Sequence, residues 1–360
     1  MAAKGPSQVF FAPVDRSGKL PAGAIRRLFD AAGLGECFKP RDLVALKLHF
    51  GESGNRNVWR PEQAREVVTA VRARGGLPFL TDANVLYKSK RHNAVEHLEV
   101  AASNGFSFES AGAPLVIADG LRGDSFVELA VPGGKHYKKA KLAAEIARAD
   151  AVLALTHVTG HMLFGLGGAL KNLGMGSGSV AGKQMMHERF QPEVRQDKCT
   201  ACAACAEHCP TGAMAVPEGG KATLTAEKCI GCGECVAHCP SGAIPVQWGD
   251  TRGLQERVVE FCAALLAGRP ERFGFVSLLT AVTGNCDCMH EPGKPIVPDI
   301  GAVASRDAVA ADQAVLDLLA KAPGGPGALE RAAPGTEIGL AQGLAERLGL
   351  GSRRYELREV

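Results

Sequence analysis

The sequence has few aromatic residues and no long apolar run. Aromatic side chains make up 5% of its 360 residues and are not interleaved with basic residues as on a nucleic-acid-binding surface. The longest apolar runs, such as residues 151–155, are far shorter than the roughly 20 residues that span a bilayer. The first residues lack the apolar segment of a signal peptide. We therefore expect no nucleic-acid partner, no membrane association and a cytoplasmic location.

The glycine-rich stretch 165–178 does not complete either common nucleotide-binding motif. A P-loop requires G-x4-G-K-[ST], but Gly182-Lys183 is followed by Gln184. A dinucleotide fingerprint requires G-x-G-x-x-G, and this stretch lacks the last glycine and the later acidic residue. The sequence therefore carries no convincing nucleotide signature. A tight turn or a backbone-lined anion loop with Lys171 as counter-charge remains open.

Cysteine, in contrast, is abundant and regularly spaced. Eight of the twelve cysteines fall in two copies of the motif C-x2-C-x2-C-x3-C-P, which begin at Cys199 and Cys229. This is the bacterial ferredoxin run that binds [4Fe–4S] clusters. Dense disulfides are typical of small secreted domains, and a zinc site does not explain the third and fourth cysteines or the proline. The spacing therefore predicts two [4Fe–4S] clusters as cofactors.

The two cysteine runs are expected to exchange one ligand each. Three cysteines of a run wrap one cluster, and the fourth lies too far along the chain, so that it serves the other cluster. One predicted ligand set is Cys199, Cys202, Cys205 and Cys239. The other predicted set is Cys229, Cys232, Cys235 and Cys209.

Bound clusters would change the charge of this segment. Residues 190–247 contain four Lys/Arg and six Asp/Glu, although the whole chain has a formal net charge of +3. Each oxidised cluster with its four thiolates carries roughly −2, so the segment reaches about −6 with both clusters. Such a surface repels nucleic acid and favours a basic docking face. We expect a redox partner protein, either an electron donor or an electron acceptor.

The remainder of the chain alternates strand and helix patterns. Strands are predicted at residues 43–49, 77–82, 115–119, 150–157, 273–282, 295–303 and 354–360. Helices are predicted at residues 61–74, 138–149, 254–267 and 308–320. This alternation predicts an α/β fold with a mostly parallel sheet and helices on both faces. Residues 1–190 and 248–360 would form this body, and residues 191–247 a small α+β two-cluster ferredoxin-like insert.

Polar residues gather where the predicted parallel strands end, which is the edge where α/β sheets bind ligands. The candidate catalytic residues are His49, Asp82, His157, His161, Lys171, Cys286 and Cys288, with Glu52, Asp119, Asn172, His187 and Asp287 nearby. They offer acid/base, nucleophilic and metal-ligating groups for an unknown small-molecule or metal ligand. The two cysteines of C-x-C would share one ion if the segment is extended. Alternatively, the histidines are hydrogen-bonded core residues and the cysteines are ordinary buried thiols, as expected for Cys37 and Cys262.

Four segments together resemble a known family. They are K-L-H-F-G-E at residues 47–52, residues 75–87, the stretch 160–176, and C-D-C at 286–288 followed by residues 295–301. These segments are similar to the DUF362 family, in its form with an inserted bacterial-type 2[4Fe–4S] ferredoxin domain. The resemblance covers nearly the whole chain and is weakest over residues 322–360. It implies clusters and architecture but no substrate, because the family is named for an unknown function.

Three kinds of function fit these patterns. The first is an iron–sulfur protein whose two clusters relay electrons to a site in the α/β body, as an oxidoreductase or a redox-driven maturation protein of unknown substrate. The second is a non-catalytic ferredoxin-type electron carrier or a subunit of a larger redox complex. The third is a binding module whose clusters are structural. The sequence favours the first, because acid/base and thiol residues gather in the body.

Overall fold

The computed structural model describes residues 5–55, 57–86, 89–187, 192–209, 211–229, 235, 239–244, 251–289 and 291–360. Its main feature is an eight-stranded sheet with the order β14-β1-β13-β12-β7-β2-β3-β4. Strand β13 runs antiparallel to both of its neighbours, and the other five pairings are parallel. The predicted α/β fold with a mostly parallel sheet is therefore confirmed.

The strands of this sheet are short, as the apolar runs predicted. They are β1 (Ser7–Pro13), β2 (Leu43–Lys47), β3 (Leu77–Asp82), β4 (Leu115–Ile117), β7 (Ala151–His157), β12 (Phe273–Leu279), β13 (Gly301–Ser305) and β14 (Tyr355–Glu359). The main helices are α1 (Ala24–Ala31), α2 (Pro61–Ala73), α3 (Ala94–Ser103), α5 (Ala144–Arg148), α6 (Ala169–Gly174), α7 (Val180–Met186), α10 (Thr251–Leu266), α11 (Ala308–Lys321), α12 (Ala328–Ala332) and α13 (Leu340–Arg347). Among the described helices, none has the length and apolarity needed to cross a membrane.

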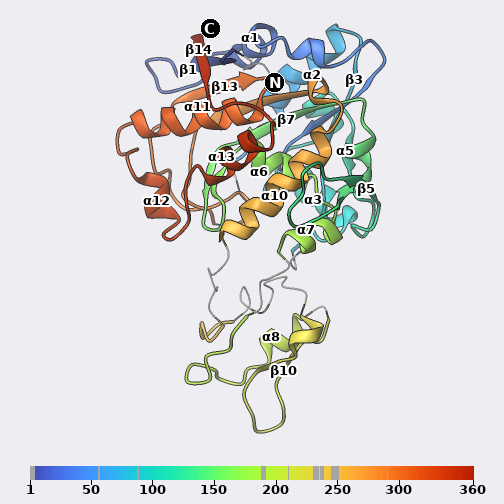
Figure 1. Ribbon diagram of the computed structural model, residues 1–360, viewed down its shortest axis with the longest axis vertical. Coiled ribbons are helices and arrows are strands. Elements are labelled where there is room, and N and C mark those ends of the chain that lie inside the picture. The colour runs from blue at the N-terminus through green and yellow to red at the C-terminus, as the bar shows by residue number, and fades with distance from the viewer. Residues whose placement is uncertain are drawn as a thin grey trace.

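Helices cover both faces of the sheet (Figure 1). Successive residues of the central strand β2 show why. Val44 and Leu46 lie in one buried cluster with side chains of α1 and α2. Ala45 points the other way and belongs to a second cluster with side chains of α6, α10 and α13. A strand that is buried on both faces is a continuous apolar run, in which apolar and polar residues do not alternate. This is why the sequence predicted β2 clearly.

Two of the sequence predictions are wrong in part. The helix predicted at 138–149 is a strand, β6 (Lys139–Ala143), followed by the short helix α5. Strand β6 pairs antiparallel with β5 (Phe126–Ala130). Its buried Ala140 and Leu142 alternate with more exposed lysines, which is the two-residue period of a strand. This period was missed in the sequence because alanine and lysine also favour helices. The strand predicted at 295–303 begins only at Gly301, because the prolines before it cannot donate to a sheet.

The cysteine-run segment has a small core of its own. It contains α8 (Ala204–Glu207), β10 (Met214–Ala215) and β11 (Thr223–Leu224), which Figure 1 draws apart from the large sheet. Cys205, Met214 and Ile244 are members of a separate buried cluster. The predicted division of the chain into a body and a ferredoxin-like insert at residues 191–247 stays a prediction.

Candidate functional site

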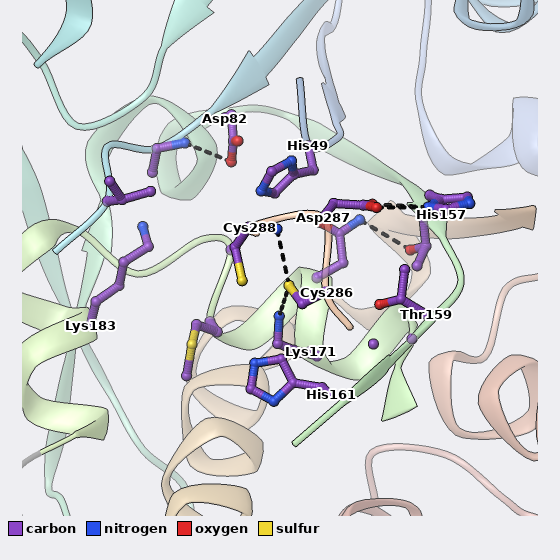
Figure 2. A pocket seen from close by; sticks show the side chains of 18 of the residues that line it. His49, Asp82, His157, Thr159, His161, Lys171, Lys183, Cys286, Asp287 and Cys288 are labelled. Atoms are coloured by element: carbon purple, nitrogen blue, oxygen red, sulfur yellow. Dashed lines mark hydrogen bonds and ion pairs between the residues drawn. The ribbon is translucent and has the colours of Figure 1, made fainter. Parts of the chain in front are cut away.

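A cavity of about 250 Å³ lies at the edge where the parallel strands β2, β3, β7 and β12 end (Figure 2). All seven candidate catalytic residues line it: His49, Asp82, His157, His161, Lys171, Cys286 and Cys288. Of the predicted neighbours, Asn172, His187 and Asp287 also line the cavity. Glu52 and Asp119 do not line it and instead bond to Arg91 and Asn84. The structure thus brings the seven side chains together, and their catalytic role stays a prediction.

The sulfur of Cys286 accepts hydrogen bonds from charged and polar groups of this cavity. It accepts one from Lys171 Nζ at 3.3 Å and another from the backbone N–H of Cys288 at 3.3 Å. A hydrogen bond from the Cys288 thiol, supported by the Lys171 ammonium, lowers the pKa of Cys286 to about 6 in spite of burial. The same hydrogen bond between the two sulfurs raises the pKa of Cys288 well above its ordinary value. Cys286 is therefore the thiolate of the pair at neutral pH, and Cys288 is the thiol.

The loop that carries both cysteines is anchored by His157 at the end of β7. Its Nδ1 lies 3.0 Å from both carboxylate oxygens of Asp287, and its Nε2 lies 2.8 Å from the carbonyl oxygen of Thr280. Both partners accept hydrogen bonds, so both ring nitrogens must carry protons. Burial alone would lower the pKa of His157, but the Asp287 carboxylate outweighs it and raises that pKa. His157 is therefore an imidazolium that positions the loop.

His49 and His161 are held in the opposite state, as neutral rings. Nδ1 of His161 accepts from the backbone N–H groups of Leu163 and Phe164 at 3.2 and 3.1 Å. Nδ1 of His49 accepts from Gly51 at 2.9 Å. Burial lowers the pKa of both histidines well below the ordinary value. Each neutral ring therefore carries its proton on Nε2 and offers an N–H donor.

The cavity also contains a group of atoms suited to a metal ion. The donor atoms of His161, Cys286 and Cys288 lie within 4.8 Å of one another, close enough to share one ion. Thiolate and imidazole ligands suit soft or borderline metals such as Zn²⁺. His161 would have to move its proton from Nε2, which requires breaking its two contacts to the backbone at Nδ1. The histidine is therefore the weakest member of this group.

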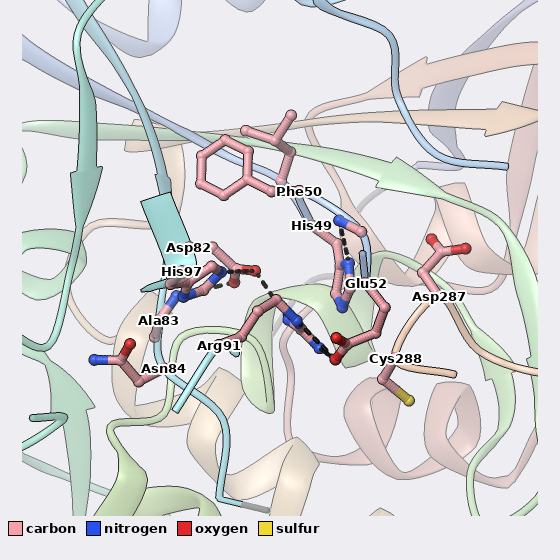
Figure 3. Close-up of polar contacts among 12 residues, drawn as sticks. His49, Phe50, Glu52, Asp82, Ala83, Asn84, Arg91, His97, Asp287 and Cys288 are labelled. Carbon is pink, nitrogen blue, oxygen red and sulfur yellow. Dashed lines mark hydrogen bonds and ion pairs between the residues drawn. The ribbon is translucent and has the colours of Figure 1, made fainter. Parts of the chain in front are cut away.

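The cavity is also lined by Lys47 and Arg91, two charged residues that the sequence analysis did not select; Figure 3 shows Arg91 between Asp82 and Glu52. Lys47 Nζ lies 2.8 Å from Asn172 Oδ1 and 3.1 Å from Asp82 Oδ1. Burial alone would raise the pKa of Asp82, but the Lys47 ammonium holds it well below the ordinary range. Arg91 donates to Glu52 Oε1 from Nε at 2.9 Å and from a terminal nitrogen at 2.7 Å. A lysine that ends an otherwise apolar strand was the signal that could have identified Lys47.

Helix α6 places Lys171 in the cavity, and Asp312 of α11 fixes this helix. The Asp312 carboxylate accepts from the backbone N–H of Ala169 at 2.6 Å and of Leu170 at 3.0 Å. A Cβ at Gly168 would lie 2.3 Å from Asp312 Oδ1, so this approach requires a glycine. The glycine-rich stretch therefore serves close packing around α6 rather than a complete nucleotide motif. No sequence pattern marked Asp312 as a partner of this stretch.

The cysteines of the first predicted ligand set lie around a second, smaller cavity. Its lining includes Cys199, Cys202, Cys205 and Cys239. The structure thus brings Cys239 of the second run to three cysteines of the first run. Ala201 and Ala203 adopt left-handed φ values of 58° and 60°, which are uncommon outside glycine and which wind the loop so that its cysteines face one space.

The other predicted ligand set is described in part. Cys232 lies outside the described residues, and Cys235 is buried in the small core. Cys209 Sγ accepts from the backbone N–H of Ala213 at 3.1 Å and of Met214 at 3.4 Å. Backbone donors to sulfur of this kind tune the potential of iron–sulfur clusters.

The last two cysteines lie in the body. Cys37 and Cys262 are fully buried and donate to the carbonyl oxygens of Phe273 and Leu170. Burial raises the pKa of Cys37 to about 11 and that of Cys262 further still. These thiols stay protonated at neutral pH, as expected of structural cysteines.

Comparison with known proteins adds a family and two distant likenesses. The search of curated proteins gave no significant match. The structure is similar to the lactate racemase apoprotein from Thermoanaerobacterium thermosaccharolyticum, with a TM-score of 0.41, 10% identity, and coverage of 88% of this chain and 57% of that one. A crystal structure of a protein from Thermotoga maritima gives a TM-score of 0.35 and 10% identity, with coverage of 72% and 50%. The chain thus spans about half the length of either protein. The model of the family described as "Domain of unknown function (DUF362)" matches residues 44–317, most of the sequence, and the chain therefore belongs to the DUF362 family.

Proposed function

We propose that this chain is an iron–sulfur redox protein in which two [4Fe–4S] clusters relay electrons between a partner protein and the cavity of the α/β body. The observation that carries the proposal is the cavity lined by Cys199, Cys202, Cys205 and Cys239. These residues are the ligand set that the exchange of fourth cysteines between two ferredoxin runs requires. Disulfide or zinc chemistry gives no reason for this exchange.

The chemistry of the surroundings also fits a cluster. Apart from Thr200 and Ser241, the rest of the lining is made of apolar residues such as Ala203, Ala222 and Ile244. The backbone N–H of Ala222 donates to Cys199 Sγ at 3.4 Å. When bound, each cluster supplies one-electron transfer at a potential set by such hydrogen bonds and by burial.

The α/β body supports a reaction at the end of this relay. Its cavity combines a thiolate next to Lys171, neutral histidine donors and the ion-paired carboxylates of Asp82 and Asp287. Such a collection of perturbed groups is typical of active sites. We therefore favour an oxidoreductase or a redox-driven maturation protein over an electron carrier that uses the body for docking.

Iron analysis of cysteine variants tests the ligand assignment. The anaerobically purified protein should contain about eight iron atoms and about eight acid-labile sulfides per chain. Cys205→Ala and Cys239→Ala should each lower the iron content to about four, because each removes a ligand of the same cluster. The double variant should also hold about four, whereas Cys205→Ala combined with Cys229→Ala should hold almost none.

Cys286→Ala is the matched control, since it is also a buried cysteine but lies outside the runs. It should keep about eight iron atoms. An iron content near zero in the wild-type protein, with zinc in its place, would contradict the proposal. Equal iron contents in the two double variants would contradict the exchange of fourth cysteines. A second measurement, reduction of the bound clusters by a one-electron donor, excludes purely structural clusters if it succeeds.

A further inference from the structure

We infer that Cys286 and Cys288 form a redox-active dithiol–disulfide couple in the body cavity, which receives its electrons from the two clusters. Both cysteines line the cavity, and their sulfur atoms lie within 4.8 Å of each other. Figure 2 shows both sulfurs in the same part of the cavity, beside Lys171. The part of the inference that names the clusters as the source of electrons rests on the proposed function. The couple itself does not.

The backbone allows a bond between the two sulfurs. Residues two apart span at most about 7 Å in an extended chain, which is already near the limit for a disulfide. Here the segment is not extended, because the backbone N–H of Met289 donates to the carbonyl oxygen of Cys286 at 2.9 Å and closes a turn. The intervening Asp287 is held at its carboxylate by His157 and at its carbonyl oxygen by the Asn55 side chain, so the turn is anchored at its centre. A bond between Sγ atoms requires side-chain rotation but no refolding of the loop.

The two cysteines also differ in how readily they lose a proton, as a redox-active dithiol requires. The hydrogen bonds from Lys171 Nζ and from the Cys288 backbone N–H both go to the sulfur of Cys286, where they stabilise negative charge. The thiolate is the attacking and leaving species in thiol–disulfide exchange, and the adjacent thiol is the one that closes or resolves the bond. Cys37 and Cys262 differ from this pair, because each donates to a backbone carbonyl oxygen and burial raises the pKa of each thiol.

The reduction balances with groups present on the chain and a named donor. Breaking the bond between the sulfur atoms takes two electrons, which the two clusters would supply when bound and which an external one-electron redox protein would replenish. One proton from solvent is taken up by Cys288, which becomes a thiol. Cys286 becomes a thiolate beside the Lys171 ammonium. In the reverse direction the couple passes two electrons to an acceptor in the cavity, whose volume of about 250 Å³ suits a small molecule.

A shared metal ion is the competing use of these sulfurs. It would need a lone pair from His161, whose Nδ1 already accepts two backbone N–H groups and whose Nε2 therefore carries the proton. The dithiol requires no such change. If the protein binds zinc and its two cysteines then no longer undergo thiol exchange, a metal site would take the place of the proposed couple.

The couple can be followed in the full-length protein by mass spectrometry. Anaerobic samples are equilibrated in mixtures of reduced and oxidised dithiothreitol, quenched in acid and alkylated after unfolding. The tryptic peptide of residues 273–306 contains Cys286 and Cys288 and no other cysteine. We expect it to change in one reversible transition from two alkyl groups to none, while the peptides with Cys37 and Cys262 stay alkylated. A peptide that keeps two alkyl groups in every mixture would overturn the inference, as would bound zinc that blocks the transition.

Lys171 variants test the asymmetry of the pair. Lys171→Met removes the charge beside Cys286, so the dithiol form should become less stable by up to about tenfold in its exchange equilibrium, or about 30 mV for two electrons. Lys171→Arg should restore most of this shift. No difference between the two variants would show that Lys171 does not act on the couple.

The electron source is tested separately. Reduced methyl viologen, a one-electron donor, should reduce the disulfide quickly in the wild-type protein and much more slowly in Cys205→Ala. If the disulfide forms reversibly in dithiothreitol but viologen reduces both proteins equally, the couple stands and the proposed relay fails. If no disulfide forms while both clusters are present and reducible, the relay stands and the couple fails.

Discussion

Asp312 is the residue whose removal should most directly disturb the helix that presents Lys171. It is fully buried on α11, and its carboxylate accepts from the first two backbone N–H groups of α6, those of Ala169 and Leu170. Asp312→Ala leaves both amides buried without these acceptors, at a cost of about 1–3 kcal/mol each, or about 2–6 kcal/mol in all. Asp312→Asn keeps one acceptor oxygen and should cost roughly half as much.

The same carboxyl should give the protein a pH-dependent stability. Burial raises the pKa of Asp312 from 3.8 to about 6, although the amides of α6 oppose this shift. The folded state therefore holds the proton more tightly than the unfolded chain, so the stability that this group contributes is full below 3.8 and is lost as pH rises through about 6. Between about pH 5 and about pH 7 the loss spans roughly one pKa unit, or about 1.4 kcal/mol. Asp312→Asn cannot ionise and should lack this slope.

Urea unfolding at both pH values, together with hydrogen exchange of the α6 amides, measures these effects. The difference in unfolding free energy between wild type and Asp312→Asn should change by about 1.4 kcal/mol between about pH 5 and about pH 7. Equal slopes for the two proteins would refute the reasoning, as would normal protection of α6 in Asp312→Ala. Asp317→Asn is the control, because this residue of α11 bonds to Tyr355 and Gln313 and leaves the cap of α6 intact. A lower rate of Cys286 alkylation in the Asp312 variants alone would link the cap to the position of Lys171.

Two further substitutions test the packing and the charges of the body. Gly174→Ala would place a Cβ 2.4 Å from the carbonyl oxygen of Val258, so α6 and α10 must separate, and we expect a loss of about 1–3 kcal/mol in thermal unfolding. Gly343→Ala, also in a helix but with its nearest atom 3.6 Å away, should instead stabilise by about 0.5–1 kcal/mol; a loss at both sites would contradict the steric argument. Lys47→Met leaves Asp82 buried without its closest cation and should cost about 3–5 kcal/mol in urea unfolding at neutral pH. Adding Asp82→Asn should recover part of this cost. If the double variant instead loses the sum of the two single losses in unfolding free energy, the two residues are not coupled.

Local sequence patterns were sufficient to predict the central strands and the edge where the cavity lies. Strands β2 and β7 are continuous apolar runs because they are buried on both faces, and their parallel direction brings His49 and His157 to one edge. Asp312 could not be found in this way, since it meets Ala169 at a separation of 143 residues. The strand β6 was missed because alanine and lysine favour helices, and pairing with β5 overrides that preference.

The C-x-C segment shows a different limit of sequence reasoning. In an extended segment, both side chains point the same way, and this led to the expectation of one shared ion. The structure has a turn closed by Met289 instead, and the neighbouring histidine offers a proton rather than a lone pair. Neither the turn nor the tautomer can be read from residue types, because both depend on which backbone groups lie nearby. The donor atoms of these cysteines and of His161 still lie within 4.8 Å of one another, so the shared ion that the spacing suggested stays a prediction beside the dithiol chemistry that the turn allows.

The state of the cavity argues for a reaction there rather than for a docking platform. Lys171 is half-buried and the Cys286 sulfur is buried, and withdrawing such a pair from water is costly unless its geometry is maintained. Further contacts maintain it, since Asp312 fixes the helix of Lys171 and the His157 imidazolium fixes the loop of Cys286. A surface that only receives a partner protein has no need for a buried, oriented thiolate. The arrangement is expected where electrons or protons are exchanged with a bound molecule, so loss of turnover in Cys286→Ala with full iron content is the result that would separate an enzyme from a carrier.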